Sequence, residues 1–357
     1  MKRGRSSSLA AMSGELPLPL PPHVDLGSVD GVWRVDYESR FRDASAWAEE
    51  HALLPATRDE ERVCLLAVDT QNTFCTPGFE LFVGGRSGSG ALDDSRRLCA
   101  FVYHQLGLIT QIVVTLDTHQ AFQIFHATFL VDEDGRHPDP YTLVTQEDVA
   151  AGRWRVDDDA AGTLGLDDPR AYLAGYVQAL AAGGKYDLTI WPFHAMLGGI
   201  GHALVSALEE AFFFHAIARS SQTRFEIKGR HPLTEHYSVL GPEVQPDSRD
   251  AGLGERNAAL VAHLSGFDAV IVAGQAKSHC VAWTIADLLD EVPEIAPRLY
   301  LLEDCTSPVV VPGAVDYGDE AHEAFARFAE AGAHVVRSTD PLETWPGVLA
   351  EIVSRRG

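Results

Sequence analysis

Three residues of this sequence combine chemical types and positions that suit nucleophilic catalysis. Cys280 follows an apolar run that starts at Ala269 and precedes an amphipathic stretch, a pattern that indicates strand, turn and helix. A thiol near the start of a helix lies close to unpaired backbone N–H groups, which favour the thiolate. A single cysteine is more often a small buried hydrophobe. However, Asp69 and Lys228 end two other β-rich runs. A base, a cation and a nucleophilic sulfur are the parts of acyl-transfer catalysis.

The elements that would position these residues alternate along the chain. Strands are predicted near 63–68, 111–116, 223–227, 268–273, 298–303 and 334–337. Helices are predicted near 35–51, 93–107, 201–217, 251–265, 280–290 and 318–332. This alternation predicts a three-layer α/β fold, in which helices cover both faces of a mainly parallel six-stranded sheet. Because sites in such sheets form at the carboxyl ends of strands, we expect Asp69, Lys228 and Cys280 to meet there.

A second set of residues has the types that bind metal ions. Asp117 and His119 follow the apolar run 112–116, and their i, i+2 spacing places both side chains on one side of extended backbone. His126 and His194 complete a mixed nitrogen and oxygen set that suits zinc, iron or manganese. The alternative is a group of hydrogen-bonded loop histidines, because a chain with 15 histidines can gather several by chance.

Five motifs that contain these residues occur in one order along the chain. They are Val68-Asp-Thr-Gln-Asn-Thr-Phe-Cys75, Asp117-Thr-His119, Trp191-Pro-Phe-His194, Ile227-Lys-Gly229 and Gly274-Gln-Ala-Lys-Ser-His-Cys-Val281. In this order they resemble the isochorismatase-like cysteine hydrolases and, within that family, the nicotinamidases. The resemblance runs from about residue 63 to about residue 336, with one long interruption.

The resemblance implies hydrolysis of a carboxamide by covalent catalysis. Cys280 would attack the carboxamide carbon, Asp69 would take and return the proton, and Lys228 would stabilise the charged pair. The backbone N–H groups of Ala276 and Cys280 would hold the oxyanion. The family also implies a cis peptide bond between Gln275 and Ala276.

The resemblance further implies a divalent metal ion, with zinc expected first and iron or manganese as alternatives. The implied ligands are Asp117, His119, His194 and His126. The separation of His126 from His119 is one residue longer than the family pattern. Phe74 and Trp191 would sandwich an aromatic substrate ring, and plain core packing is the alternative for both.

The domain organisation separates an N-terminal extension, 1–58, from one hydrolase domain, 59–357. In the extension, 1–28 is predicted to be a mobile tail, and the following helix carries Tyr37, Phe41 and Trp47, which can pack on the body or on a neighbouring subunit. An insertion at about 129–187 has no counterpart in the resemblance, and we expect it to act as a lid or an oligomer contact. We therefore expect a homo-oligomer that binds a small-molecule amide.

Composition excludes several classes of function. A net charge of −23 argues against nucleic acid or an anionic membrane as a partner. The five cysteines include no C-x-x-C pair, which favours a reducing cytoplasm over a disulfide framework. No stretch has the length and hydrophobicity of a membrane span, and the N-terminus lacks the apolar core of a signal peptide. The cysteines predicted to be structural are Cys64, Cys75, Cys99 and Cys305.

Three other functions remain open at this point. A metal-independent amidase of the same family, acting on a carbamoyl or ureido group, would keep Asp69, Lys228 and Cys280 without needing His194. An isochorismate-type vinyl-ether hydrolase normally lacks the cysteine, so Cys280 argues against it. A non-enzymatic scaffold that binds a partner through the fold and the N-terminal extension would tolerate the loss of Cys280.

Overall fold

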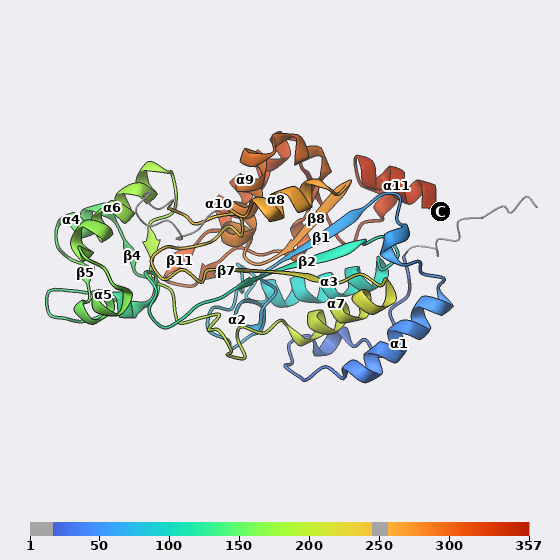
Figure 1. The fold of residues 1–357 in the computed structure, drawn as a ribbon, viewed down its shortest axis with the longest axis horizontal. Coiled ribbons are helices and arrows are strands. Elements are labelled where there is room, and N and C mark those ends of the chain that lie inside the picture. The colour runs from blue at the N-terminus through green and yellow to red at the C-terminus, as the bar shows by residue number, and fades with distance from the viewer. Residues whose placement is uncertain (1–16, 245–255, 357) are drawn as a thin grey trace, which may run out of the picture.

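The computed structural model describes residues 17–244 and 256–356, and its centre is a six-stranded parallel sheet (Figure 1). The strand order is β12-β9-β8-β1-β2-β7, and each neighbouring pair is parallel. The bounds are β1 (Val63–Val68), β2 (Gln111–Asp117), β7 (Arg224–Lys228), β8 (Ala269–Gly274), β9 (Leu299–Leu302) and β12 (His334–Val336). Each strand begins and ends within one residue of its predicted range, and the predicted fold class is confirmed.

The two central strands define where a site can form. Every residue of β1 and β8 is buried, as expected for continuous apolar runs in the middle of a parallel sheet. The chain leaves β1 towards β2 and β7 on one side, and the later strands β8, β9 and β12 lie on the other side. The strand order therefore reverses between β1 and β8, and the carboxyl ends of these strands flank the opening where ligands bind in such folds.

Helices cover both faces of the sheet. In Figure 1, α8, α9 and α10 lie above the sheet, and α3 and α7 lie below it. The bounds are α3 (Gly90–His104), α7 (Ser206–Ala218), α8 (Ala258–Ser265), α9 (Ala282–Glu291), α10 (Gly318–Glu330) and α11 (Val348–Arg356).

Two helix starts differ from their predicted positions by five residues or more. The prediction of a helix from residue 201 is wrong, because residues 201–205 form a turn and a single bridge to the segment after β1: the N–H groups of Thr73 and Asn72 donate to Gly201 and Ala203, and Val205 donates to Thr70. The helix predicted from residue 251 begins at Ala258, where the Asn257 side chain caps it. Residues 251–255 lie outside the described residues.

The predicted tail over 1–28 is wrong for the part that the structure describes. Leu18 is buried, and its N–H donates to the carbonyl of His104. The ring of His23 packs against Tyr103 and Phe214. The Pro-rich patch thus supplies apolar contacts to the body, and residues 1–16 lie outside the described residues.

The predicted helix of the N-terminal extension is present as α1 (Tyr37–Glu50). The Asp36 side chain accepts a hydrogen bond from the Ser39 N–H and begins the helix. Trp47 is buried, and α1 packs along α7. Tyr37 and Phe41 remain 45% and 50% exposed.

The insertion forms a lobe at one end of the molecule, seen at the left of Figure 1. It contains β3 (Leu130–Val131), β4 (Leu143–Val144), α4 (Gln146–Ala150), β5 (Arg155–Val156), α5 (Asp158–Leu164) and α6 (Pro169–Ala182). Strand β4 pairs with β6 (Leu188–Thr189), which leads the chain back to the domain. Among the described residues, no helix combines the length and hydrophobicity needed to cross a bilayer.

Candidate active site

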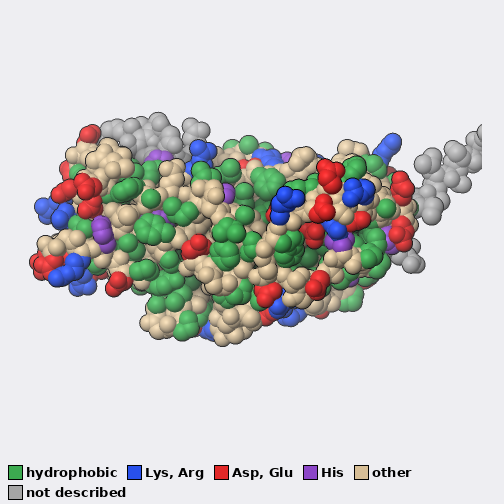
Figure 2. Space-filling model, turned by 90° about the horizontal axis from the view of Figure 1, so that it is seen from below, with side chains coloured by type: hydrophobic (Ala, Val, Ile, Leu, Met, Phe, Trp, Pro, Cys, Tyr) green, Lys and Arg blue, Asp and Glu red, His purple; other side chains and the backbone are tan. Residues whose placement is uncertain are grey.

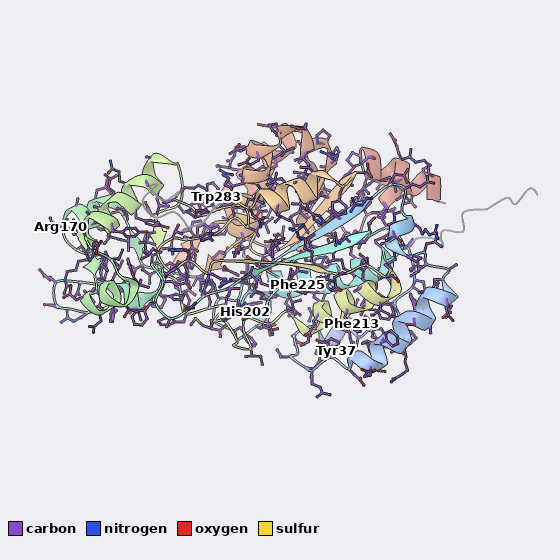
Figure 3. All side chains as sticks on the ribbon, in the orientation of Figure 1. Tyr37, Arg170, His202, Phe213, Phe225 and Trp283 are labelled. Atoms are coloured by element: carbon purple, nitrogen blue, oxygen red, sulfur yellow. The ribbon has the colours of Figure 1, made fainter. Side chains whose placement is uncertain are left out.

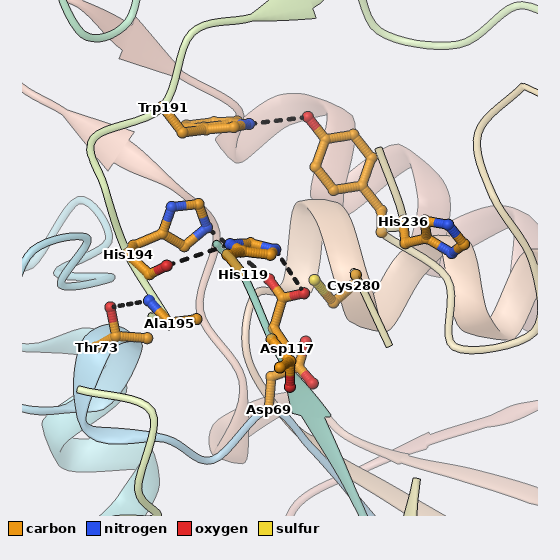
Figure 4. Close-up of polar contacts among 12 residues, drawn as sticks. Asp69, Thr73, Asp117, His119, Trp191, His194, Ala195, His236 and Cys280 are labelled. Carbon is orange, nitrogen blue, oxygen red and sulfur yellow. Dashed lines mark hydrogen bonds and ion pairs between the residues drawn. The ribbon is translucent and has the colours of Figure 1, made fainter. Parts of the chain in front are cut away.

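The structure brings Asp69, Lys228 and Cys280 together at the carboxyl end of the sheet. Asp69 and Cys280 are labelled in Figure 4. Asp69 follows β1, Lys228 ends β7, and Cys280 lies in a π-helical turn (Lys277–Val281) between β8 and α9. The Lys228 Nζ atom lies 3.0 Å from Asp69 Oδ2 and 3.4 Å from Cys280 Sγ. It also lies 2.9 Å from Asp117 Oδ1 and donates to the carbonyl of His236 at 3.0 Å. One cation therefore joins two carboxylates and the thiol.

Asp69 is held by a side chain of the neighbouring strand. Its backbone N–H donates to Thr115 Oγ1 at 3.0 Å, and the Thr115 hydroxyl donates to Asp69 Oδ1. Asp69 is fully buried and its φ is 45°, an uncommon value for a residue other than glycine. The second carboxylate oxygen thus points to Lys228 while the first is fixed.

Burial decides the resting protonation state of the thiol. Burial raises the pKa of Cys280 well above its ordinary value, although Lys228 acts in the opposite direction. The thiolate expected from a helix start is therefore not the resting form, and Cys280 lies at the fourth residue of the helical turn rather than the first. Burial also raises the pKa of Asp69, again against the effect of Lys228. Asp69 and Cys280 both contact the ammonium of Lys228, and burial favours the neutral form of each.

The cation and the second carboxylate remain charged. Burial alone would lower the pKa of Lys228, but Asp117 and Asp69 raise it well above its ordinary value. Burial alone would raise the pKa of Asp117, but His119 and Lys228 hold it below its usual range.

The loop before Cys280 presents backbone N–H groups to the same place. The peptide bond between Gln275 and Ala276 is cis. The Gln275 side chain is bonded at both ends: Nε2 donates to Asp94 Oδ2 at 2.8 Å, and Oε1 accepts from the Ser307 N–H at 3.2 Å. These two hydrogen bonds fix Gln275, the residue that precedes the Ala276 N–H.

Two glycines are required by the close approach of these elements. Gly274 has a φ of 111°, and a Cβ atom there would lie 2.0 Å from the carbonyl oxygen of Val68. Gly229 follows Lys228 with a φ of 78°, and its Cβ would lie 2.5 Å from Asp117 Oδ1. Any side chain at either position would displace the strand end that carries a site residue.

Three buried histidines form a group that fits a metal ion. His119, His126 and His194 each present a ring nitrogen, and these nitrogens lie within 4.8 Å of one another. Neither ring nitrogen of His126 has a hydrogen-bond partner among the described residues. Burial lowers the pKa of His126 to about 4 and that of His194 well below its ordinary value. Burial thus favours the neutral form of His126 and His194, and neutral imidazole nitrogens are suited to coordinate a divalent ion.

Hydrogen bonds orient two of these rings. His194 Nδ1 lies 2.7 Å from the Pro192 carbonyl, and His119 Nδ1 lies 3.2 Å from the His194 carbonyl. Each ring therefore turns its Nε2 atom towards Asp117, at 3.8 Å from His194 and 3.0 Å from His119. Asp117 borders the histidine group and at the same time contacts Lys228, so the histidine group shares one carboxylate contact with the triad of Asp69, Lys228 and Cys280.

A small cavity of about 30 Å³ lies between the triad and the histidines. Phe74, on the short helix α2 (Asn72–Cys75), and Trp191 line it, as the resemblance implies. The Trp191 Nε1–H donates to the Tyr237 hydroxyl at 3.2 Å, and Phe74 meets the His194 ring edge to face.

Several lining residues were not predicted. They are Leu81, Val83, Glu235, Tyr237, His279 and Val309. Glu235 and Tyr237 belong to an irregular segment after β7, where no periodicity or motif marks them. Burial, followed by the charge of Asp117, raises the pKa of Glu235 well above its usual range.

The insertion supports the walls of the cavity. The Tyr186 hydroxyl donates to the Ser278 carbonyl at 3.0 Å, two residues before Cys280. The Glu235 N–H donates to the Tyr176 hydroxyl of α6 at 2.9 Å. These contacts agree with a covering role for the insertion, which stays a prediction.

Comparison with known proteins gives structural matches and no sequence match. No protein-family model and no curated protein sequence matches the chain. Among solved structures, the Acinetobacter baumanii nicotinamidase/pyrazinamidase is 20% identical, with 79% of this chain and 99% of that chain covered at a TM-score of 0.48. The yeast nicotinamidase is 19% identical, with 77% and 99% covered at 0.48. The Pyrococcus horikoshii pyrazinamidase, solved with zinc, is 17% identical, with 77% and 99% covered at 0.40.

All three matches have TM-scores below 0.5. At such identities they leave the activity to be inferred from the site itself.

Proposed function

We propose that this protein is a cysteine hydrolase that cleaves a carboxamide C–N bond through a thioester intermediate. The observation that supports this most is the contact of one buried ammonium with a buried carboxylate at 3.0 Å and a buried thiol at 3.4 Å. Acyl transfer needs a nucleophile, a base and a charge-stabilising group at this spacing.

In the proposed mechanism, Asp69 moves one proton twice. It takes the proton of Cys280 while the sulfur attacks the carboxamide carbon, and Lys228 stabilises the resulting charge. The N–H groups of Ala276 and Cys280 hold the oxyanion. When the tetrahedral intermediate collapses, Asp69 returns the proton to the leaving nitrogen, which departs as ammonia. Water then attacks the thioester, Asp69 accepts its proton, and the carboxylic acid leaves as Cys280 regains the thiol.

We further propose that the substrate is nicotinamide or a related azine carboxamide, converted to the carboxylate and ammonia. His119, His126 and His194, with Asp117, would hold the divalent ion, which when bound would offer a coordination position to a ring nitrogen. Phe74 and Trp191 would stack on the ring. The cavity beside Cys280 would then place the carboxamide against the sulfur.

The test is ammonia release from a panel of carboxamides, measured together with the metal content of the protein. Nicotinamide and pyrazinamide represent the azines, benzamide lacks the ring nitrogen, and a ureido compound represents the metal-independent alternative. We expect turnover of the azines, weak turnover of benzamide, and none with Cys280→Ala. Turnover of the ureido compound alone, by protein free of metal, would replace the nicotinamidase proposal with the metal-independent amidase.

A further inference from the structure

In the described residues, strand β7 is one edge of the central sheet. In the part of the chain that the structure describes, β2 is the only strand paired with β7. The outer edge of such a strand presents unpaired N–H and C=O groups, which proteins usually protect with proline, a bulge or outward charges. Residues 224–227 contain no proline, and the two outward side chains on one face are Phe225 and Ile227, 49% and 53% exposed.

Two further aromatic side chains that are not fully buried lie on helices α7 and α1. Helix α7 is mostly apolar, and its two glutamates bond to α1: Glu209 accepts from Tyr37, and Glu210 pairs with Arg40. Its residue Phe213 is only partly buried and meets exposed Tyr37 of α1 edge to face, with 4.9 Å between ring centres. Phe225, Phe213 and Tyr37 are labelled in turn below the sheet in Figure 3. Seen from below, hydrophobic side chains are scattered over the whole face, and charged ones are numerous at the left end and over the right half (Figure 2).

The sequence of β7 is complementary to itself in one antiparallel register. If two copies pair with Phe225 opposite Phe225, Arg224 of one copy lies opposite Glu226 of the other, and this happens twice. Thr223 then lies opposite Ile227. Arg224 and Glu226 are on the same face of the strand, where they already form an ion pair within one chain at 2.5 Å.

The neighbouring register is excluded by charge. With Glu226 opposite Glu226, two carboxylates would face each other at the axis, and Arg224 would lie opposite Lys228. Like charges directly opposite each other destabilise a strand pair. Between these two registers, charge therefore favours the one centred on Phe225.

We propose that β7 is the interface of a two-fold symmetric homodimer, in which the β7 edges of two copies pair antiparallel about Phe225 and join the two sheets into one. We infer that the partner strand is β7 of a second copy, because the charged and apolar side chains of β7 are complementary to those of an antiparallel β7. An isologous interface requires such self-complementarity. This proposal gives the homo-oligomer expected from the sequence a two-fold axis and a pair of interface strands. Phe213 and Tyr37 would flank the axis on the α7 side of the sheet.

The oligomeric state of the full chain and its variants tests this proposal. Size-exclusion chromatography with light scattering should give a dimer for the unmodified protein and a monomer for Phe225→Glu. The matched control is Leu54→Glu, which places the same charge at a side chain that is 48% exposed and lies outside β7, and it should remain dimeric. A monomeric unmodified protein at micromolar concentration, or a dimer that Phe225→Glu leaves intact, would overturn the proposal.

A charge-exchange experiment tests the register without depending on that variant. Arg224→Glu places two glutamates opposite each other, and Glu226→Arg places two arginines opposite each other, so each variant alone should be monomeric. An equimolar mixture should form the heterodimer, because each copy then meets the opposite charge on its partner. Loss of the ion pair within one chain cannot produce such rescue on mixing. If the mixture stays monomeric, the pairing register is refuted.

Covalent trapping gives a third readout. Phe225→Cys should form a disulfide-linked dimer under mild oxidation, since residues at the axis face themselves across a distance that a disulfide can bridge. The control Leu54→Cys should stay unlinked. Equal crosslinking of both variants would count against the interface.

Discussion

Replacement of Lys228 by methionine probes the electrostatic centre of the site. The ammonium lies 3.0 Å from Asp69 Oδ2 and 2.9 Å from Asp117 Oδ1, and methionine keeps an unbranched apolar chain without the charge. At an effective dielectric constant of about 20, a pair of unit charges at this distance interacts by about 5 kcal/mol. Removing one partner of a buried ion pair typically costs about 3–5 kcal/mol. We expect the free energy of unfolding to fall by that amount.

The same substitution should reduce turnover. Lys228 contacts the sulfur at 3.4 Å, so the developing thiolate would lose its cation. A loss of about 3–5 kcal/mol of stabilisation corresponds to about 10²–10⁴-fold in rate. Lys277→Met is the matched control, because Lys277 is also buried but lies over the Phe325 ring, 4.3 Å from its centre, instead of joining the triad. It should retain most of the turnover.

A double-mutant cycle with Asp69→Asn separates the pair from its surroundings. Urea denaturation and ammonia release are measured for both single variants and for the double variant. Once Asp69 is neutral, removal of Lys228 leaves one fewer unpaired charge, so the double variant should lose less than the sum of the single losses in both assays. Losses that add within about 0.5 kcal/mol would show that Asp69 and Lys228 do not act as a unit.

Four further predictions follow from other contacts. Iodoacetamide should modify Cys280 before the other four buried cysteines, with activity lost in proportion; equal labelling of all five would refute a functional thiol. His126→Ala should lower the bound divalent metal measured by mass spectrometry and raise KM for nicotinamide, whereas unchanged metal content would remove His126 from the site. Gln275→Leu should lower kcat about tenfold or more with little change in KM or in the alkylation rate of Cys280, because it frees the loop that carries the Ala276 N–H; an unchanged kcat would contradict that positioning role. Burial lowers the pKa of His215 to about 4, so acid protonates the unfolded chain first, and stability that is complete above about pH 6.5 is lost as the pH falls towards 4. His215→Gln should remove up to about 3 kcal/mol of this loss in urea titrations at several pH values, and an identical pH profile would refute it.

The fold was predictable because its central strands are short, continuous apolar runs that are easy to recognise in the sequence. The runs of β1 and β8 are made of apolar or small residues, which marks central parallel strands; Asp69 follows β1, and β8 ends at Gly274. Asp69, Lys228 and Cys280 could be assigned to one site from this pattern, because parallel strands place their carboxyl ends at one edge.

The parts that the sequence did not predict depend on tertiary contacts. Glu235 and Tyr237 reach the cavity from an irregular segment that is held by Tyr176 of the insertion and by Trp191, and no local pattern records such contacts. The start of α7 shifted because residues 201–205 bond to the segment after β1. The resting state of Cys280 depends on burial, which outweighs the effect of a helix start.

The most direct measurement of covalent catalysis is the mass of the protein during turnover. The enzyme is mixed with nicotinamide, quenched in acid within the first turnovers, digested and analysed by mass spectrometry. A nicotinoyl thioester is expected on the peptide that contains Cys280, with the label lost on incubation at neutral pH and absent from Cys280→Ala. Ammonia release at full rate by Cys280→Ala, or an acyl group on a different residue, would contradict catalysis by Cys280.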